Sequence, residues 1–267
     1  MSNQRIVTLT TDFGVSDPFA SIMRGVVLSI NPQANVVDIS HEVPSFDLLD
    51  GALTIASAYP YYPSGSIHLV VVDPGVGGAR RPILVNTQNH LFVAPDNGVL
   101  SLVFQREERV EVRHITADHF FRQPVSQTFH GRDVFAPVAA WLSRDVPPEK
   151  FGDVVEDFAR LNVPAVRTAA PNRISAVVLK VDKFGNLITN VTPESAPQLF
   201  QASPPAFRMT VGSATVNRLS TSYSEGKPGE LIALLGSLGF LEIAANHASA
   251  AQAAQAGRGA PVEIAFD

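Results

Sequence analysis

Residues 66–78, with the sequence SIHLVVVDPGVGG, contain the pattern that decides the fold. The run from Ser66 to Asp73 is almost entirely apolar and ends in a carboxylate, and a Pro/Gly-rich segment follows it at once. An apolar run bounded by turn residues is typical of a strand that is covered on both faces, as in a parallel sheet. We therefore predict a buried strand over residues 66–73, with polar side chains displayed where it ends.

The sequence around this strand alternates apolar runs with helical patterns. In the first half of the chain we expect strands over 5–11 and 35–39, helices over 17–30, 46–58 and 133–142, and a hairpin of 83–86 with 91–94. The helix over 17–30 is the best defined, because Asp17 can cap it, Pro18 suits its first position and Asn31 precedes a proline that ends it. This alternation predicts an α/β domain with a mainly parallel central sheet.

The pattern changes after about Leu161. Short apolar runs separated by turn residues indicate strands over 174–181, 187–191, 207–211, 215–219, 231–235, 241–244 and 262–266, with an Ala-rich helix over 249–256. Regular short strands of this kind predict a smaller β-barrel-like domain. We place the N-terminal α/β domain at 1–163, a linker at 164–172 and the C-terminal domain at 173–267.

The composition excludes several classes of function. A formal net charge of −5 argues against nucleic acid as a partner, because phosphate binding needs a basic surface. The sequence has no cysteine, which excludes disulfides, thiolate metal sites and a cysteine nucleophile. No apolar run reaches the ~18 residues of a membrane span and no signal-peptide core is present, so we expect a cytoplasmic protein without a membrane partner.

The fraction of charged residues is also informative. It is 17%, whereas roughly 25% is usual for a soluble domain. Either the core is large or another subunit covers part of the surface, and two smaller domains favour the second explanation, because smaller domains bury proportionally less surface.

Four polar clusters in the first half stand at predicted strand ends or a helix entrance, where ligands bind in α/β sheets. They are centred on Asp12, Asp73, Asp96 and His130. The charge of Asp73 would be costly to bury unless Arg80 or Arg81 pairs with it, and such a pair could equally be structural. The cluster around Asp96 is a turn sequence. His130 lies near the positive end of a predicted helix, which favours a neutral imidazole and so a hydrogen-bond acceptor or base.

Further candidates come from the remaining loops. Asp12 could accept two hydrogen bonds from a sugar diol or simply cap a turn, and Asp17 could simply cap its helix. In the second half, the turn from Asp182 to Asn186 could read a purine edge through the asparagine amide, or serve only as a hairpin. The loops at 236–239 and 246–247 are weaker signals. An acidic metal site ranks low, because no paired histidines or dense carboxylates accompany these residues.

The clusters together resemble one family. The segments TDFG (11–14), DPGVG (73–77), APDNG (94–98), FHGRD (129–133), 182–190 and 237–246 are similar, in order, to the S-adenosyl-L-methionine hydroxide adenosyltransferases. These are hydrolytic relatives of fluorinase and chlorinase. The resemblance implies an α/β domain joined to a β-barrel-like domain, and a homotrimer with the ligand between neighbouring subunits.

The resemblance also implies a reaction, the hydrolysis of S-adenosyl-L-methionine (SAM) to adenosine and L-methionine by in-line attack of water or hydroxide at the ribose 5′ carbon. No cofactor and no metal is expected. Two alternatives remain open, a halide-dependent adenosyltransferase and a non-catalytic protein that binds adenosine or SAM.

Residue roles follow from the matched motifs. By resemblance, the nucleophile is organised by Asp73, Arg80 and His130, with His130 as base and Arg81 as a near competitor of Arg80. The substrate contacts implied are Asp12 for the ribose, Asp17 for the methionine amino group, Phe46 as an apolar face, Asn186 for adenine, Ser237 for the methionine carboxylate, and Asp182 and Asn246 within the matched loops. Leu238 departs from the fluorinating relatives, which have an arginine there, so a contact of that side chain with the methionine carboxylate is not implied. The long N-terminal insertion of fluorinases is also absent, and together with Arg80 and His130 these departures indicate water rather than fluoride as the nucleophile.

Overall fold

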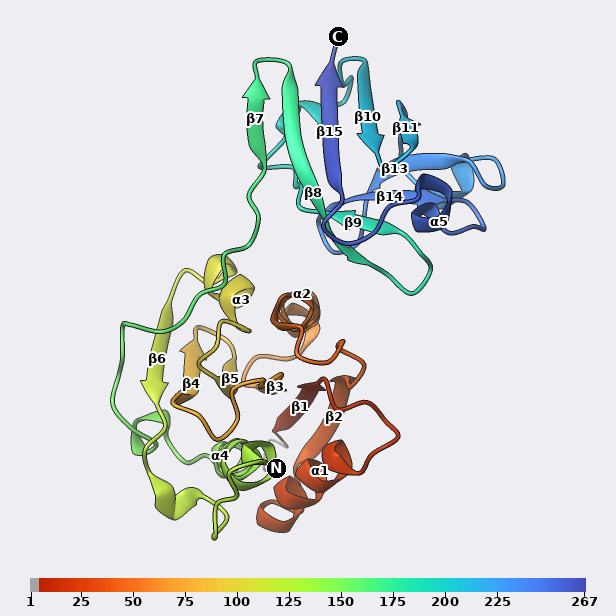
Figure 1. Cartoon of the computed structure of the whole chain (residues 1–267). Helices are drawn as coiled ribbons and strands as arrows, with labels where there is room; N and C mark the ends of the chain where they lie inside the picture. The colour runs from red at the N-terminus through yellow and green to blue at the C-terminus, as the bar shows by residue number, and fades with distance from the viewer. Residues whose placement is uncertain (1–4) are drawn as a thin grey trace. The chain divides into compact units, whose positions relative to one another are not determined.

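A six-stranded sheet forms the centre of the first of two units, which ends at Asn162 and is followed by a second unit, Val163–Asp267. The computed structural model describes residues 5–267. The strand order is β2-β1-β3-β5-β4-β6 (Figure 1). The strands are β1 (Ile6–Thr11), β2 (Asn35–Ser40), β3 (Ile67–Val71), β4 (Pro82–Thr87), β5 (Leu91–Pro95) and β6 (Val110–His114).

The sheet is parallel over four strands and antiparallel over the rest. β1 pairs in parallel with β2 and β3, and β3 pairs in parallel with β5. β4 runs antiparallel to both β5 and β6. The prediction of an α/β unit is confirmed, and the mainly parallel sheet fits in part, because β4 is antiparallel to both of its neighbours. The expected 83–86/91–94 hairpin is the antiparallel β4–β5 pair.

Helices cover both faces of this sheet, as Figure 1 shows. They are α1 (Phe19–Ile30), α2 (Leu48–Ala58), α3 (Ser101–Arg106) and α4 (Ala136–Leu142). Leu69 of β3 belongs to the core that contains Met23 and Val138 from α1 and α4. Its neighbour Val70 belongs to a second core with Ile55 of α2. Successive side chains of a strand point to opposite faces, so β3 is buried on both sides, as its apolar sequence predicts.

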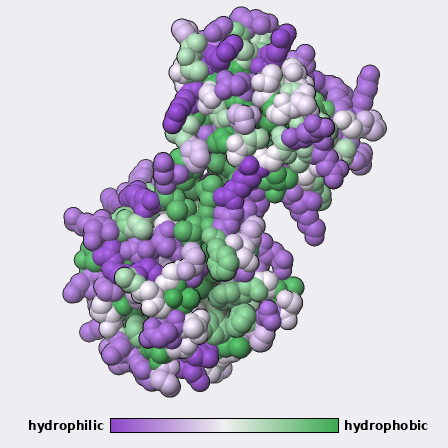
Figure 2. Space-filling model, in the orientation of Figure 1, coloured by the Kyte–Doolittle hydropathy of each residue, from purple (hydrophilic) through white to green (hydrophobic). Residues whose placement is uncertain are grey.

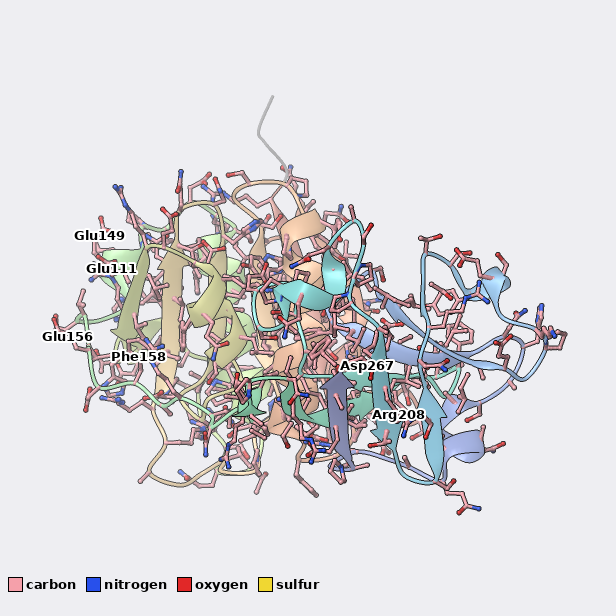
Figure 3. All side chains as sticks on the ribbon, turned by 90° about the horizontal axis from the view of Figure 1, so that it is seen from above. Glu111, Glu149, Glu156, Phe158, Arg208 and Asp267 are labelled. Atoms are coloured by element: carbon pink, nitrogen blue, oxygen red, sulfur yellow. The ribbon has the colours of Figure 1, made fainter. Side chains whose placement is uncertain are left out.

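The second unit is built on a nine-stranded sheet with the order β11-β10-β15-β8-β9-β14-β13-β12, and β7 pairs with β8 at its side. Its elements are β7 (Arg167–Ala170), β8 (Arg173–Val181), β9 (Leu187–Thr189), β10 (Phe207–Val211), β11 (Ala214–Val216), β12 (Leu219–Ser220), β13 (Leu231–Leu235), β14 (Leu241–Ala245), β15 (Pro261–Phe266) and α5 (Ala250–Ala254). The sheet curls around its own core (Figure 1). Arg208 of β10 and Asp267, which follows β15, mark two adjacent strands in Figure 3.

Short helical turns join these elements. They are the 3-10 turns Tyr59–Tyr61, Asp118–Phe120, Pro148–Lys150, Pro197–Phe200 and Tyr223–Glu225, and the π-helical turn η3 (Gly131–Phe135). No helix in residues 5–267 has the length and apolar character that crossing a bilayer requires.

Several predicted boundaries are wrong for identifiable reasons. α1 begins at Phe19, with Pro18 at the N-cap and no side-chain cap bond, so Asp17 does not cap it. α2 begins at Leu48 because the side chain of Asp47 accepts the N–H of Asp50 at 3.0 Å. Phe46 precedes that cap with a positive φ of 67° and lies outside the helix. A capping carboxylate thus decides the start of α2, where apolar periodicity alone extends it too far.

Other differences come from local backbone geometry. The helix predicted over 133–142 begins earlier, as the turn η3 that leads into α4. The strand predicted over 215–219 divides into β11 and β12. The predicted Ala-rich helix is shortened to α5, because Ser249 caps it and Gln255 ends it in the left-handed conformation. The elements α3, β6 and β7 are not among the predictions, and β7 lies inside the segment 164–172 that we interpreted as a linker.

Candidate active site

Three predicted site residues of the first unit meet in one ionic cluster. Asp73 follows β3, and Arg80 returns along the Gly-rich turn to face it. The Arg80 Nε donates to Asp73 Oδ1 and Oδ2 at 3.0 and 3.1 Å, and the Arg80 Nη2 also pairs with Oδ2. The same Nη2 lies 2.8 Å from His130 Nδ1. The side chains of Arg80 and Asp73 are only 9% and 5% exposed, so water screens this ion pair weakly.

The contact between Arg80 and His130 fixes the proton on the imidazole. A guanidinium can only donate, so His130 Nδ1 must accept from it. Burial and then the charge of Arg80 lower the pKa of His130, whereas the charges of Asp73 and Asp133 oppose this shift. The neutral imidazole therefore carries its hydrogen on Nε2. This geometry agrees with the neutral imidazole that the sequence predicts. The remaining ring nitrogen, Nε2, is however a hydrogen-bond donor, whereas the sequence analysis predicts an acceptor or a base.

Arg81 takes a different direction from Arg80. It donates to Asp96 Oδ2 through Nε and Nη2 at 2.9 and 2.7 Å, and its Nη1 reaches Asp157 Oδ1 at 2.8 Å. Asp96 also accepts the N–H of Ala159 at 2.7 Å. The structure thus brings Arg80, and not Arg81, to Asp73. Asp96 holds the chain segment around residue 159 and lies in an ionic cluster of its own.

Asp12 stands at the end of the neighbouring strand β1. Its Oδ2 accepts the backbone N–H of Phe46 at 2.8 Å. Burial is the main cause that raises the pKa of Asp12, and the nearby charge of Asp73 acts in the same direction. The two carboxylates therefore lie at the same sheet edge, within electrostatic range of each other. Phe46 is 71% exposed beside them, whereas Asp17 is exposed on the loop before α1.

Further contacts brace the turn that carries Asp12, and one of the residues that make them, His41, is absent from our sequence predictions. His41 Nδ1 lies 2.8 Å from the Thr11 hydroxyl, which in turn accepts the N–H of Phe13 at 3.3 Å. The Phe13 ring packs edge-on against Phe129 at 5.8 Å between centroids, directly before His130. The turn after β1 is thus connected to the segment that carries His130.

The other predicted site residues lie in the second unit, around a cavity of about 720 Å³. Its lining includes Asp182, Asn186, Ser237 and Asn246, together with Leu238. No group of His, Asp or Glu side chains suited to a metal ion occurs in residues 5–267.

Asp182 fixes the orientation of Asn186. The carboxylate Oδ1 of Asp182 accepts the N–H groups of Phe184 and Asn186 at 2.9 and 2.8 Å, and Oδ2 accepts the Asn186 Nδ2 at 2.9 Å. This last bond identifies the amide nitrogen of Asn186 and leaves its carbonyl oxygen and one N–H for another partner. Asn186 is therefore a preoriented donor and acceptor at the cavity wall. Asn246 instead uses its Nδ2 on the Gly226 carbonyl at 2.7 Å.

Glu242 and Tyr223 also line this cavity and are absent from our sequence predictions. The Tyr223 hydroxyl donates to Glu242 Oε2 at 2.8 Å. Burial and the charge of Glu242 raise the pKa of Tyr223 to about 12, and burial raises the pKa of Glu242. Gly236 leaves room for this carboxylate: a Cβ there would stand 1.8 Å from Glu242 Oε1, so a larger residue would force the Glu242 side chain to move. The signal in the sequence is a single carboxylate inside the apolar strand LEIAA.

Comparisons with known proteins agree with the division of the chain into two units. Residues 7–152 match the SAM hydroxide adenosyltransferase N-terminal domain, and residues 176–263 match the SAM hydroxide adenosyltransferase C-terminal domain. The (R)-S-adenosyl-L-methionine hydrolase of Salinispora tropica is 38% identical over 92% of both chains. The fluorinase of Nocardia brasiliensis is 24% identical, again over 92% of both chains. A crystal structure of an uncharacterized conserved protein from Thermotoga maritima superposes with a TM-score of 0.90 at 34% identity, covering 97% of this chain and 99% of that one.

Proposed function

The chain belongs to the SAM hydroxide adenosyltransferase family, and we propose that it hydrolyses SAM to adenosine and L-methionine. Relatives named (R)-S-adenosyl-L-methionine hydrolase, 32–38% identical over most of the chain, support this function. The observation that carries it for this chain is the Arg80 guanidinium that joins Asp73 to His130 beside the strand ends. The relatives' name leads us to propose the (R) epimer at sulfur as the substrate.

The reaction needs a nucleophile and little else. A C5′–O bond forms as the C5′–S bond breaks, and the electron pair of the broken bond stays on sulfur, which leaves as the neutral thioether of methionine. A sulfonium therefore needs no general acid. When hydroxide attacks, adenosine forms without a proton transfer in the site; when water attacks, one proton is released. Holding the oxygen in line behind C5′ is the main task, and positioning of this kind contributes up to ~7–11 kcal/mol.

We assign the nucleophile to the Asp73–Arg80–His130 cluster. The positive charge of Arg80 favours hydroxide over water, and the Nε2–H of His130 donates to the oxygen and leaves a lone pair for attack. Asp73 keeps Arg80 in place. His130 thus acts as a donor that orients the nucleophile, which replaces the role of base that the resemblance implies.

The substrate contacts are divided between the units. Asp12 is proposed to bind the ribose hydroxyls, Asp17 the methionine amino group, and Phe46 to cover the ligand. In the second unit, the Asn186 amide is proposed to read adenine with Asp182 as its support, while Ser237 and Asn246 complete the cavity. Leu238 supplies no charge, so the methionine carboxylate must find its partners elsewhere.

Because the assigned residues occur on both units, we propose a homotrimer in which the first unit of one subunit and the second unit of a neighbour form each site. The exposed apolar side chains Val15, Phe46 and Phe184 support this assembly, with exposures of 78%, 71% and 77%. Apolar residues also reach the visible surface of both units in Figure 2. Light scattering should give three times the monomer mass, and a monomer that remains fully active would contradict the shared site.

The function is tested by incubating the purified protein with the (R) and (S) epimers of SAM and following adenosine by chromatography. We expect adenosine from the (R) epimer in stoichiometric amount with L-methionine. Adenosine at the uncatalysed rate, together with tight SAM binding, would indicate a binding protein instead. Formation of 5′-chloro-5′-deoxyadenosine in chloride would indicate the halide-dependent alternative, which the fluorinase relative makes worth testing.

Replacing Asn186 with alanine is expected to weaken adenosine binding about tenfold. The variant removes an oriented donor and acceptor, each worth about 0.5–1.5 kcal/mol. Isothermal titration calorimetry with adenosine measures the effect. Asn190→Ala is the matched control, because the Asn190 amide serves the backbone of Val177 and Pro164. Equal adenosine affinity in Asn186→Ala and the wild type would contradict the assignment.

A further inference from the structure

Asp133 is a fully buried carboxylate next to the proposed site, and the mechanism above gives it no role. Its Oδ2 accepts the backbone N–H of Ser126 at 2.9 Å. Arg132 donates to its two oxygens through Nε and Nη2 at 2.7 and 2.8 Å. The Arg122 Nη1 lies 3.6 Å from its Oδ1. The buried carboxylate of Asp133 therefore binds residues at the beginning, in the middle and at the end of the loop over residues 122–132.

The backbone of Asp133 holds the same loop. Its carbonyl accepts the N–H of Arg122 at 2.8 Å, and its own N–H donates to the carbonyl of Phe129 at 3.2 Å. Segment 122–129 is thus attached to Asp133 at three points: the N–H of Arg122 at its beginning, the N–H of Ser126 in its middle and the carbonyl of Phe129 at its end. His130 follows that segment directly, so its position depends on the same attachments.

Segment 122–129 also touches the turn between Asp73 and Arg80. Gly77 of that turn has a φ of 75°, and a Cβ on it would lie 2.2 Å from the Gln127 carbonyl oxygen. The two backbones are therefore in direct contact. Through this contact, the carboxylate of Asp133 braces both partners of the Arg80–His130 hydrogen bond.

We propose that Asp133 is a positioning residue for the hydrolysis, which keeps His130 Nδ1 in hydrogen-bond distance of Arg80. This inference rests on the proposed function. The charged groups that act on His130 are Arg80 and Asp73 from the facing turn and Asp133 from its own segment. Asp133 in turn is faced by Arg132 and Arg122.

The variant Asp133→Asn keeps the size of the side chain and an acceptor for Ser126, but it removes the charge. We expect kcat for SAM to fall about tenfold, because a displaced catalytic group loses much of the benefit of positioning. KM for SAM and adenosine affinity should stay within about twofold, since proposed adenine contacts lie in the other unit. The acid limb of the pH–kcat profile should move to lower pH, because Asp133 no longer raises the pKa of His130.

The double variant Arg122→Gln/Arg132→Gln is the matched comparison, because it changes the charge near His130 in the opposite direction. It weakens the same brace but leaves the Asp133 charge without its cations, so kcat should fall while the acid limb moves to higher pH, opposite to Asp133→Asn. A general loss of structure would not produce shifts of opposite sign. If Asp133→Asn does not fold, the single variant Arg122→Gln, which keeps Arg132 on the carboxylate, is measured in its place, and an unchanged kcat and profile in it overturn the inference.

The result is distinguishable from failure of the proposed function. A wild-type protein that makes no adenosine from SAM would refute the function. Wild-type turnover with an Asp133→Asn variant of equal kcat and equal acid limb would refute only the role of Asp133. Asp133→Glu should restore the acid limb toward the wild-type position, because it restores the charge.

Discussion

Replacing Arg80 with alanine is expected to lower kcat for SAM hydrolysis by about 10²–10³-fold, the cost of removing one preorganised donor from an anion site. The variant also leaves the Asp73 carboxylate buried without its cation. Removing one partner of a buried ion pair costs on the order of 3–5 kcal/mol of folding free energy. Single-turnover kinetics measure the first effect, and thermal unfolding of the same preparation measures the second.

Arg81→Ala is the control for this prediction. Arg81 pairs with Asp96 and with the exposed Asp157, so its loss should reduce stability and leave turnover within about threefold of the wild type. Both variants remove a positive charge from neighbouring positions, so a general electrostatic effect would reduce both alike. Loss of activity in Arg81→Ala with normal activity in Arg80→Ala would reverse the assignment.

The fold could be predicted from apolar patterning wherever burial decides the structure. The strands over residues 6–11 and 67–71 are almost wholly buried, and their sequences, IVTLTT and IHLVV, consist mainly of apolar residues and threonine. β6 and α3 are short and carry polar residues, as in VEVRH and SLVFQR, so their patterns do not stand out. The start of α2 depends on one cap bond from Asp47, which periodicity does not encode.

The candidate site was predictable in part for a related reason. Polar residues at the ends of apolar strands, such as Asp12 and Asp73, are visible in a sequence because a buried charge is costly. The choice between Arg80 and Arg81 is not visible, since it depends on how a Gly-rich turn folds back. The tautomer of His130 likewise follows from one contact that only the folded chain makes.

Lowering the pH is expected to reduce kcat as His130 becomes protonated. A protonated imidazole has an N–H on both nitrogens, and the Nδ1–H would oppose the guanidinium of Arg80. Burial and Arg80 lower the pKa of His130, so the protein should remain active below pH 6.5, the ordinary histidine pKa. The loss of kcat at low pH must be separated from acid unfolding, because a second histidine contributes to unfolding. Burial lowers the pKa of His68 to about 3. A histidine with a depressed folded pKa reduces stability as the pH falls below about 6.5.

His130→Ala should lower kcat by about 10²-fold, because the oxygen of the nucleophile loses the Nε2–H donor. Adenosine affinity should change little, and the acid limb that belongs to His130 should disappear. The measurement is kcat from pH 4.5 to 8 at temperatures where circular dichroism shows the variant folded. His119→Ala is the control, because His119 is an exposed histidine of the same unit and its ring stacks on Phe120. An acid limb that persists unchanged in His130→Ala would assign the titration to another group, with Asp12 the first to test, since burial raises its pKa.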